Sequence, residues 1–437
     1  MHFASGHAAR GSCNEMLTLS PIQRPILRTV FRAMSHSTAP ELDKLSCMTK
    51  AIIPALDGVR GIAVLMVLAV HLAVIGVVPA QFRILNYALW TGWSGVDLFF
   101  ALSGFLITGQ LLDTLGAPGY FKNFYMRRAL RIFPLFYLAL GFTAVLYPFL
   151  PAEIQGHYPT RTGWVSHMVY LQNWWMPWKE KTHDVMGHFW SLGVEEQFYL
   201  IWPACVLWLG RKRLPYACVA GVAIALGLRT WAVLAGHEDS GVVLMGTWAR
   251  FDTLLVGALC AVIVRGRVSV QRYLPWIAAV CLAITAIIEI GAREYKHRGT
   301  YMQSFGYTVL AVGYGCVVLW AFYFSNRRNW WDRVLSWSPL RAAGKYSYGI
   351  YIWHLWVYVA GRALCGKAEW YGRSRIWSSL LALALPAVSI GVALASYHGF
   401  EKWFLRLKRR YEPGSAPSRQ EATAGRVLAR AAQADSP

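Results

Sequence analysis

The side chains that could do chemistry in this sequence are ionisable groups inside long apolar runs. The first two are Arg60 and His71, which are eleven residues apart. In a helix this spacing is three turns, with about 20° of drift and a rise of about 16 Å, so both side chains lie on one face. An imidazole inside an apolar span can serve as a general base near neutral pH. The alternative is a structural histidine that donates to a backbone carbonyl.

Three carboxylates lie in later apolar runs, namely Asp97 and the tandem pair Glu195 and Glu196. A carboxylate inside a membrane span needs a proton, a cation or a histidine. We therefore expect Asp97, Glu195 or Glu196 to orient His71 from another helix. For either glutamate, stabilisation of a helix N-terminus is the alternative.

Two helical faces accompany these groups. His188, Ser191 and Glu195 share one face at i, i+3 and i+7. Small residues surround Asp97 on its own face, which predicts that another helix packs closely there. These small residues are Ser94, Ala101 and Gly104. For Ser103, packing is the simpler interpretation.

Arg128 and Arg131 are three residues apart and therefore adjacent on a helix surface. Guanidinium groups bind phosphates through paired hydrogen bonds. Together with Arg60, they predict a site for a phosphate-bearing donor, with a lipid headgroup as the alternative ligand.

Arg250, Asp252 and His354 complete the ionisable set. We expect Arg250 and Asp252 to form a structural ion pair with another helix rather than to catalyse. His354 falls in the middle of its apolar run.

The composition identifies the solvent that surrounds these side chains. Of the 437 residues, 56% are apolar and only 15% are charged, which favours lipid over water. The net charge of +21 does not indicate nucleic acid, because Lys and Arg occur in short clusters between apolar runs. The eight cysteines form no CxxC pair, so neither a disulfide framework nor a metal site is expected.

Ten apolar runs approach the roughly 20 residues that a bilayer crossing needs. They are 61–79, 94–115, 132–150, 189–209, 215–235, 251–264, 274–291, 303–324, 346–361 and 377–398. No polar linker divides 51–412. The prediction is an all-α polytopic membrane protein with one bundle of about ten helices.

Basic residues in the loops orient this bundle. The clusters at 122–131, 211–213, 265–272, 327–345 and 402–410 share one side if both termini are cytoplasmic. In this orientation the three arginines lie at the inner rim. His71 and the three carboxylates lie at similar depth in the outer half.

Three segments fall outside the bundle or between its helices. Residues 1–50 are polar and aperiodic, which predicts a disordered extension with Met34 or Met48 as an alternative start. Residues 413–437 are expected to be a disordered cytoplasmic tail. The Trp-rich outer connection 151–188 predicts a lid or an interfacial helix.

With these features in view, the sequence resembles the acyltransferase type 3 family of integral-membrane O-acyltransferases, from Ile53 to about Arg409. Seven motifs in order carry the resemblance: Leu56–Gly61 with the spacing to His71, Gly95–Phe105, Arg128–Pro134, Ser191–Pro203, Arg250–Asp252, Ser347–His354 and Glu401–Phe404. There are two departures. Trp403 stands where the last motif usually has Pro, and we expect no esterase-like domain after the bundle.

The resemblance implies ten membrane helices, an acyl-coenzyme A donor and a carbohydrate or glycolipid acceptor. It also implies that Arg60, His71, Arg128, Arg131 and Glu401 matter for function. The missing esterase-like domain weakens the case for wall or antigen polymers as acceptors.

These observations predict a multi-pass enzyme of a bacterial-type inner membrane that moves an acyl group, most simply acetyl, to a hydroxyl. In this hypothesis Arg60, Arg128 and Arg131 hold the coenzyme, and His71 takes the proton of the hydroxyl, with transfer either direct or through an acyl-enzyme. The alternative is a proton-coupled membrane transporter, since intramembrane His, Glu and Asp also build proton relays. The hydropathy pattern shows no inverted repeat, which speaks against transport.

Overall fold

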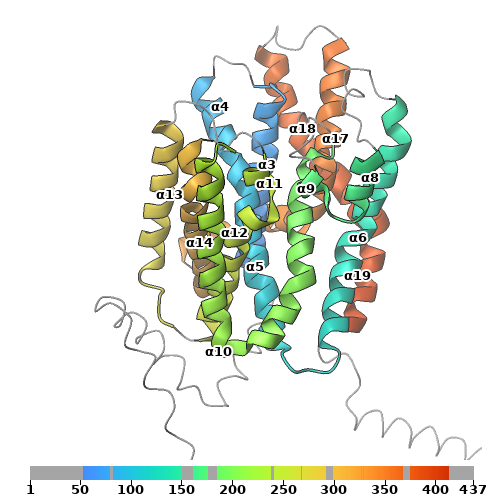
Figure 1. Cartoon of the computed structure of the whole chain (residues 1–437). Helices are drawn as coiled ribbons and strands as arrows, with labels where there is room; N and C mark the ends of the chain where they lie inside the picture. Colours follow the sequence, from blue (N-terminus) through green and yellow to red (C-terminus); the bar gives the residue numbers. More distant parts are fainter. Residues whose placement is uncertain are drawn as a thin grey trace, which may run out of the picture.

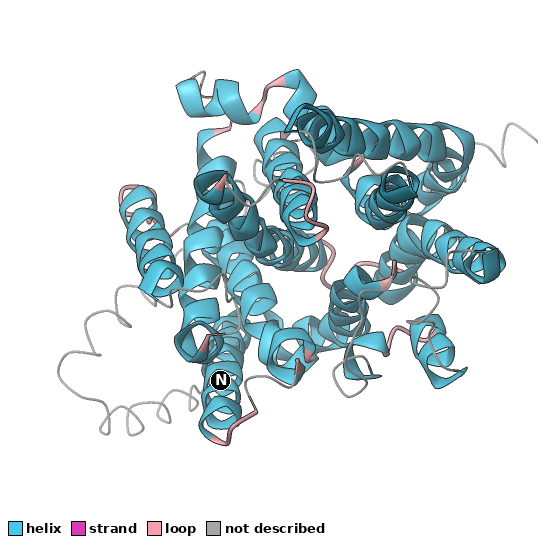
Figure 2. Cartoon of the chain, turned by 90° about the horizontal axis from the view of Figure 1, so that it is seen from above, coloured by secondary structure: helices cyan, strands magenta, loops and turns pink. Residues whose placement is uncertain are grey.

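The computed structural model describes residues 53–78, 82–149, 161–175, 185–237, 241–266, 268–291, 299–325, 327, 329–367 and 375–412. Within these residues every regular element is a helix. Seen along the helix axes, the helices stand side by side (Figure 2). The predicted extension 1–50 and the predicted tail 413–437 lie outside the described residues.

The long helices follow the apolar runs of the sequence. They are α3 (Pro54–Val74), α5 (Gly95–Asp113), α6 (Tyr120–Leu146), α10 (Trp190–Leu234), α12 (Thr247–Arg265), α13 (Leu274–Gly291), α14 (Tyr307–Phe324), α17 (Ser347–Lys367) and α18 (Arg375–Ser396). Shorter helices connect them: α4 (Arg83–Trp90), α8 (Arg161–Met168), α9 (Gln172–Trp175), α11 (Val242–Met245), α15 (Trp330–Leu335), α16 (Ser338–Lys345) and α19 (Lys402–Lys408).

Eight helical stretches among the described residues are long and apolar enough to cross a membrane. They are Pro54–Val74, Arg83–Asp113, Tyr120–Leu146, Gly187–Leu234, Val242–Arg265, Leu274–Gly291, Met302–Phe324 and Ser379–Tyr411.

Two places account for the difference from the ten predicted crossings. The stretch Gly187–Leu234 contains two predicted crossings, and its backbone leaves helical geometry at Gly210, where φ is 60° and ψ is −177°. Figure 1 shows α10 as two rods that meet at the bottom of the view. The second place is α17, which covers the predicted run 346–361 and is not among the eight stretches. Ten crossings with both termini inside therefore remain a prediction.

The centre of the bundle is made by α5 and α12. In the stretches that contain them, 72% and 78% of the most apolar window is buried, against 17% for Leu274–Gly291. The two helices meet through small residues. A Cβ on Gly104 would clash with the carbonyl of Leu254, and one on Gly257 with the carbonyl of Ala101. The predicted small-residue face around Asp97 therefore packs against α12, as membrane helices with small residues commonly do.

Part of the Trp-rich connection is docked on the bundle. Gln197 in α10 donates to the carbonyl of Tyr170 at 2.7 Å and to Asn173 Oδ1 at 2.8 Å. Asn173 in turn donates to Thr247 Oγ1 at 2.7 Å. These bonds tie α9 and the turn before it to α10 and α12 at the end of the bundle where the first rod of α10 begins (Figure 1). Residues 151–160 and 176–184 of the predicted lid lie outside the described residues.

Candidate active site

A pocket lies between α3, α5, α6, α10 and α17, with an empty volume of about 810 Å³ including its open mouth. Its walls are apolar on the α5 side and carry a few convergent polar groups, which is typical of a small-molecule site. The polar and charged lining residues are Arg60, Ser103, Arg128, Arg131, Ser191, Glu195, Tyr199, Ser347, Tyr348 and Tyr351.

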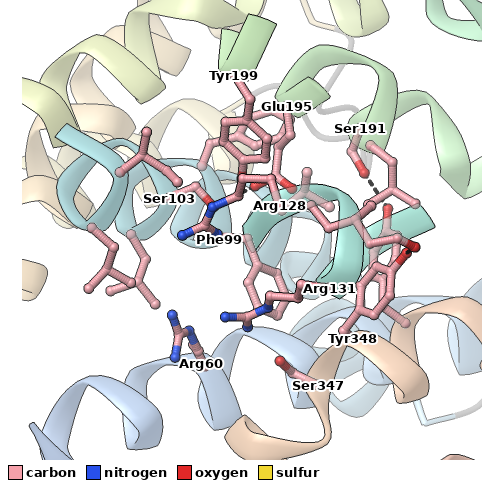
Figure 3. Close-up of a pocket in the computed structure, with 18 residues that line it drawn as sticks. Arg60, Phe99, Ser103, Arg128, Arg131, Ser191, Glu195, Tyr199, Ser347 and Tyr348 are labelled. Carbon is pink, nitrogen blue, oxygen red and sulfur yellow. Dashed lines mark hydrogen bonds between the residues drawn. The ribbon is translucent and has the colours of Figure 1, made fainter. Parts of the chain in front are cut away.

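The three arginines that the sequence predicted to act together do line this one pocket. Figure 3 shows the guanidinium groups of Arg60, Arg128 and Arg131 directed toward a shared space. Arg60 pairs with Asp57 of its own helix at 3.0 Å. Arg128 donates to Gln110 Oε1 at 3.1 Å, and within the described part of the chain neither Arg128 nor Arg131 forms an ion pair. The pocket therefore carries excess positive charge.

Glu195 of α10 lies across the pocket from Arg60 (Figure 3). It accepts a hydrogen bond of 2.5 Å from Ser103, which α5 contributes. Ser103 thus has a polar contact in the pocket, and the packing interpretation of this residue was incomplete. Glu196 does not line the pocket, and its buried Oε1 has no hydrogen-bond partner among the described residues.

Three histidines from three helical segments meet beside the pocket. The ring centroids of His71 and His354 are 4.8 Å apart, those of His188 and His354 are 4.8 Å apart, and those of His71 and His188 are 6.4 Å apart. His71 comes from α3 and His354 from α17, whereas His188 lies in the short η5 turn (Gly187–Phe189) that leads into α10. No group of three or more His, Cys, Asp or Glu residues in the described chain has the geometry of a metal site.

The histidine cluster, defined as His71, His188 and His354, adjoins the pocket through one tyrosine. Tyr351 lines the pocket, shares a 2.5 Å hydrogen bond with Ser191 Oγ, and donates to the carbonyl of His188 at 2.6 Å. His188 was not among the residues predicted to be functional. The signal was present in its shared helical face with Ser191 and Glu195, which both line the pocket.

The prediction that Asp97, Glu195 or Glu196 orients His71 is wrong. His71 Nδ1 lies 2.8 Å from the carbonyl of Val67 and 3.3 Å from His354 Nε2, and no carboxylate among the described residues bonds to it. Asp97 instead pairs with Arg250 at 2.5 Å. The physical reason is that Asp97 sits on the small-residue face against α12, where a buried carboxylate must be neutralised by the nearest cation.

A second buried pair lies next to the first. Asp252 contacts Arg229 at 2.9 Å and accepts from Thr308 at 2.7 Å. All four side chains of the two pairs are 0–1% exposed. The expectation that Arg250 and Asp252 form ion pairs with other helices is confirmed. Arg229 was not singled out from the sequence, where it is a lone cation in an apolar run.

Glu401 does not line the pocket. It ends the π-helical turn η8 (Tyr397–Glu401), which follows α18, and accepts from Ser396 at 3.1 Å. Its carboxylate lies against Gly349 of α17, where a Cβ would come within 3.1 Å of Oε1. This contact joins the C-terminal helices to the helix that carries His354.

The comparisons with known proteins agree with this geometry. Residues 53–397 match the family model described as an acyltransferase domain, so the chain belongs to the acyltransferase type 3 family. This family match favours transfer over transport. No solved structure matches the chain.

Several curated bacterial proteins are similar to it. The YrhL protein of Bacillus subtilis (strain 168) is 30% identical in an alignment that covers 80% of this chain and 54% of the relative. Peptidoglycan O-acetyltransferase OatA of Listeria monocytogenes is 28% identical over 70% of this chain and 49% of its own length. O-acetyltransferase OatA of Staphylococcus aureus is 26% identical over 69% of this chain and 50% of the relative. The chain thus spans about half the length of these relatives.

Proposed function

We propose that this protein transfers an acetyl group from acetyl-coenzyme A to a hydroxyl of a cell-surface carbohydrate or glycolipid. The observation that carries this proposal is the pocket beside the histidine cluster. It holds three arginines, two of which form no ion pair among the described residues. Two features of a coenzyme A thioester match this site. Its phosphates are anions for the guanidinium groups, and its thioester lies at the far end of a long flexible arm.

The names of the relatives support the proposed acceptor class. The Listeria relative is named a peptidoglycan O-acetyltransferase, and the Staphylococcus relative an O-acetyltransferase. A sugar hydroxyl is the simplest acceptor for this chain as well. We further propose that both chain termini are cytoplasmic, so that coenzyme and sugar reach the pocket from opposite faces of an inner membrane.

In the proposed mechanism Arg60, Arg128 and Arg131 bind the phosphates, and the thioester extends toward the histidine cluster. The acceptor O–H bond breaks as its proton passes to His71, and the oxygen bonds to the thioester carbon. The carbon–sulfur bond then breaks. The proton on His71 passes to the sulfur, so the products are an O-acetyl ester and free coenzyme A, and His71 returns to its neutral form.

The proposal is tested with purified protein in lipid nanodiscs by measuring acetyl-coenzyme A consumption and acetyl transfer to a sugar acceptor. His71→Ala should lose at least about 99% of transfer, because a positioned general base contributes roughly 100-fold or more. The matched control is His398→Ala, which removes an exposed imidazole of η8. Retention of more than about a tenth of the transfer rate by His71→Ala would remove His71 from the mechanism.

A further inference from the structure

The hydrogen bonds of the histidine cluster determine which nitrogen of His71 is free to accept a proton. His354 Nδ1 lies 2.8 Å from the carbonyl of Tyr351 and 3.2 Å from that of Ile350. A carbonyl oxygen can only accept, so Nδ1 of His354 carries the hydrogen. In a neutral ring the other nitrogen, Nε2, then has a lone pair.

The lone pair of His354 faces His71. His71 Nδ1 is 3.3 Å from His354 Nε2 and 2.8 Å from the carbonyl of Val67. Both neighbours are acceptors, so Nδ1 of His71 must be the N–H that donates to them. A charged His354 would instead place one N–H against another. The remaining nitrogen of His71, Nε2, therefore bears the lone pair of a general base.

We propose that His354 is the positioning residue of the catalytic base. This rests on the proposed role of His71. His354 accepts from His71 Nδ1–H, which turns the lone pair of His71 Nε2 toward the acceptor hydroxyl. The Val67 carbonyl is shared with the backbone N–H of His71, which lies four residues later in α3, so His354 supplies a second acceptor for Nδ1–H.

The contact gains strength during the reaction. When His71 takes the acceptor proton its ring becomes cationic, and hydrogen bonds from a charged donor are stronger than those from a neutral one. His354 is 0% exposed, so on its side of the His71 ring this stabilisation comes from the protein rather than from water. His354 keeps its own proton throughout, and only His71 gains and loses one in each turnover. An interaction that strengthens only as charge develops acts on kcat rather than on substrate binding.

Two substitutions of His354 distinguish the role of Nδ1 from the role of Nε2. In His354→Asn the amide nitrogen can replace Nδ1 and donate to Tyr351, but no acceptor remains at the position of Nε2, so His71 Nδ1–H keeps only the carbonyl of Val67. In His354→Gln the longer amide can place an oxygen near the position of Nε2. We expect His354→Asn to lower kcat by roughly 10- to 100-fold, with the KM for acetyl-coenzyme A within about twofold of wild type. His354→Gln should recover at least severalfold of this loss.

A spectroscopic readout follows the tautomer directly. Nitrogen-15 NMR of histidine-labelled protein in lipid distinguishes Nδ1–H from Nε2–H rings, and the signals of His71 are those missing from His71→Ala. The wild type should show Nδ1–H, and His354→Asn should show a population of Nε2–H. Equal kcat values for the Asn and Gln variants would overturn the proposal, as would an unchanged His71 tautomer in His354→Asn. If His354→Asn does not fold, His354→Leu takes its place in both measurements.

His167 provides the matched control. It is also buried, its Nδ1 lies 2.8 Å from the carbonyl of Gly163, four residues before it, and it is not part of the histidine cluster. His167→Asn and His167→Gln should have the same kcat. If His71→Ala stays active, the proposed function itself has failed. If His71→Ala is inactive and the two His354 variants are alike, only the positioning role has failed.

Discussion

Arginine side chains inside this bundle occupy two regions that differ in their partners. In the first region, between α5, α12 and the second rod of α10, Arg250 and Arg229 each contact an aspartate, and the four side chains are 0–1% exposed. In the second, the pocket, Arg128 and Arg131 form no ion pair among the described residues. The same residue type in the same kind of helix thus has opposite electrostatic surroundings.

The difference teaches how to assign buried charge in a membrane bundle. A charge that is already neutralised by protein holds helices together and has little left to offer a ligand. A charge without a carboxylate partner is costly unless an anion arrives to neutralise it. The first region is therefore expected to govern stability and the pocket to govern donor binding.

The largest expected effect comes from breaking a buried pair. Asp97→Ala leaves Arg250 uncompensated, and removal of one partner of a buried pair typically costs about 3–5 kcal/mol. We expect a large fall in the yield and thermal midpoint of the protein in detergent.

The matched control for that change is Asp113→Ala, which removes the partner of Arg265 in a pair whose side chains are 10% and 28% exposed. Because this pair is partly exposed to solvent, its loss should cost less stability than the loss of the fully buried Asp97–Arg250 pair. Should Asp97→Ala be as stable as Asp113→Ala, the division into a structural and a binding region would be wrong.

A smaller effect, seen in kinetics rather than stability, is expected from the double variant Arg128→Ala/Arg131→Ala. A hydrogen bond to a charged group contributes about 1.5–3 kcal/mol, so loss of each phosphate contact should raise the KM for acetyl-coenzyme A by roughly tenfold or more. The KM for the sugar acceptor and the thermal midpoint should change little.

Arg127→Ala is the control for this pair of substitutions. Arg127 precedes Arg128 in α6 but donates to the carbonyl of Tyr411 at 2.8 Å and does not line the pocket. It should leave donor binding near wild type. A double variant in which only the acceptor KM rises would assign the arginines to the sugar instead of the coenzyme.

The smallest expected effect concerns Arg60, the pocket arginine that has a carboxylate nearby. Asp57 and Arg60 are 25% and 23% exposed, so their contact contributes about 0–1 kcal/mol. Asp57→Asn should leave the thermal midpoint within a degree or two and lower the KM for acetyl-coenzyme A slightly, because the guanidinium is released. A marked loss of stability in Asp57→Asn would show that Arg60 belongs to the structural region rather than to the binding region.

The sequence alone identified most members of the site because burial in lipid makes polar residues conspicuous. His71, Glu195 and the three arginines all stand out as ionisable groups in apolar runs, and the helical repeat predicted which of them share a face. His188 and Arg229 were missed for a related reason. Arg229 is alone in its apolar run, and His188 lies at a helix start, where a polar residue is common, although it shares a face with Ser191 and Glu195.

What the sequence by itself determined is the set of helices, because each apolar run satisfies its own backbone hydrogen bonds without help from the others. What only the tertiary structure decided is which charged groups meet. Asp97 and His71 lie in neighbouring helices, and each needs a partner. Because α5 packs closely on α12, Asp97 forms an ion pair with Arg250, and His71 contacts His354 of α17 instead. Pairing across helices depends on how helices far apart in the chain are rotated and spaced. The helical repeat of the sequence does not contain this information.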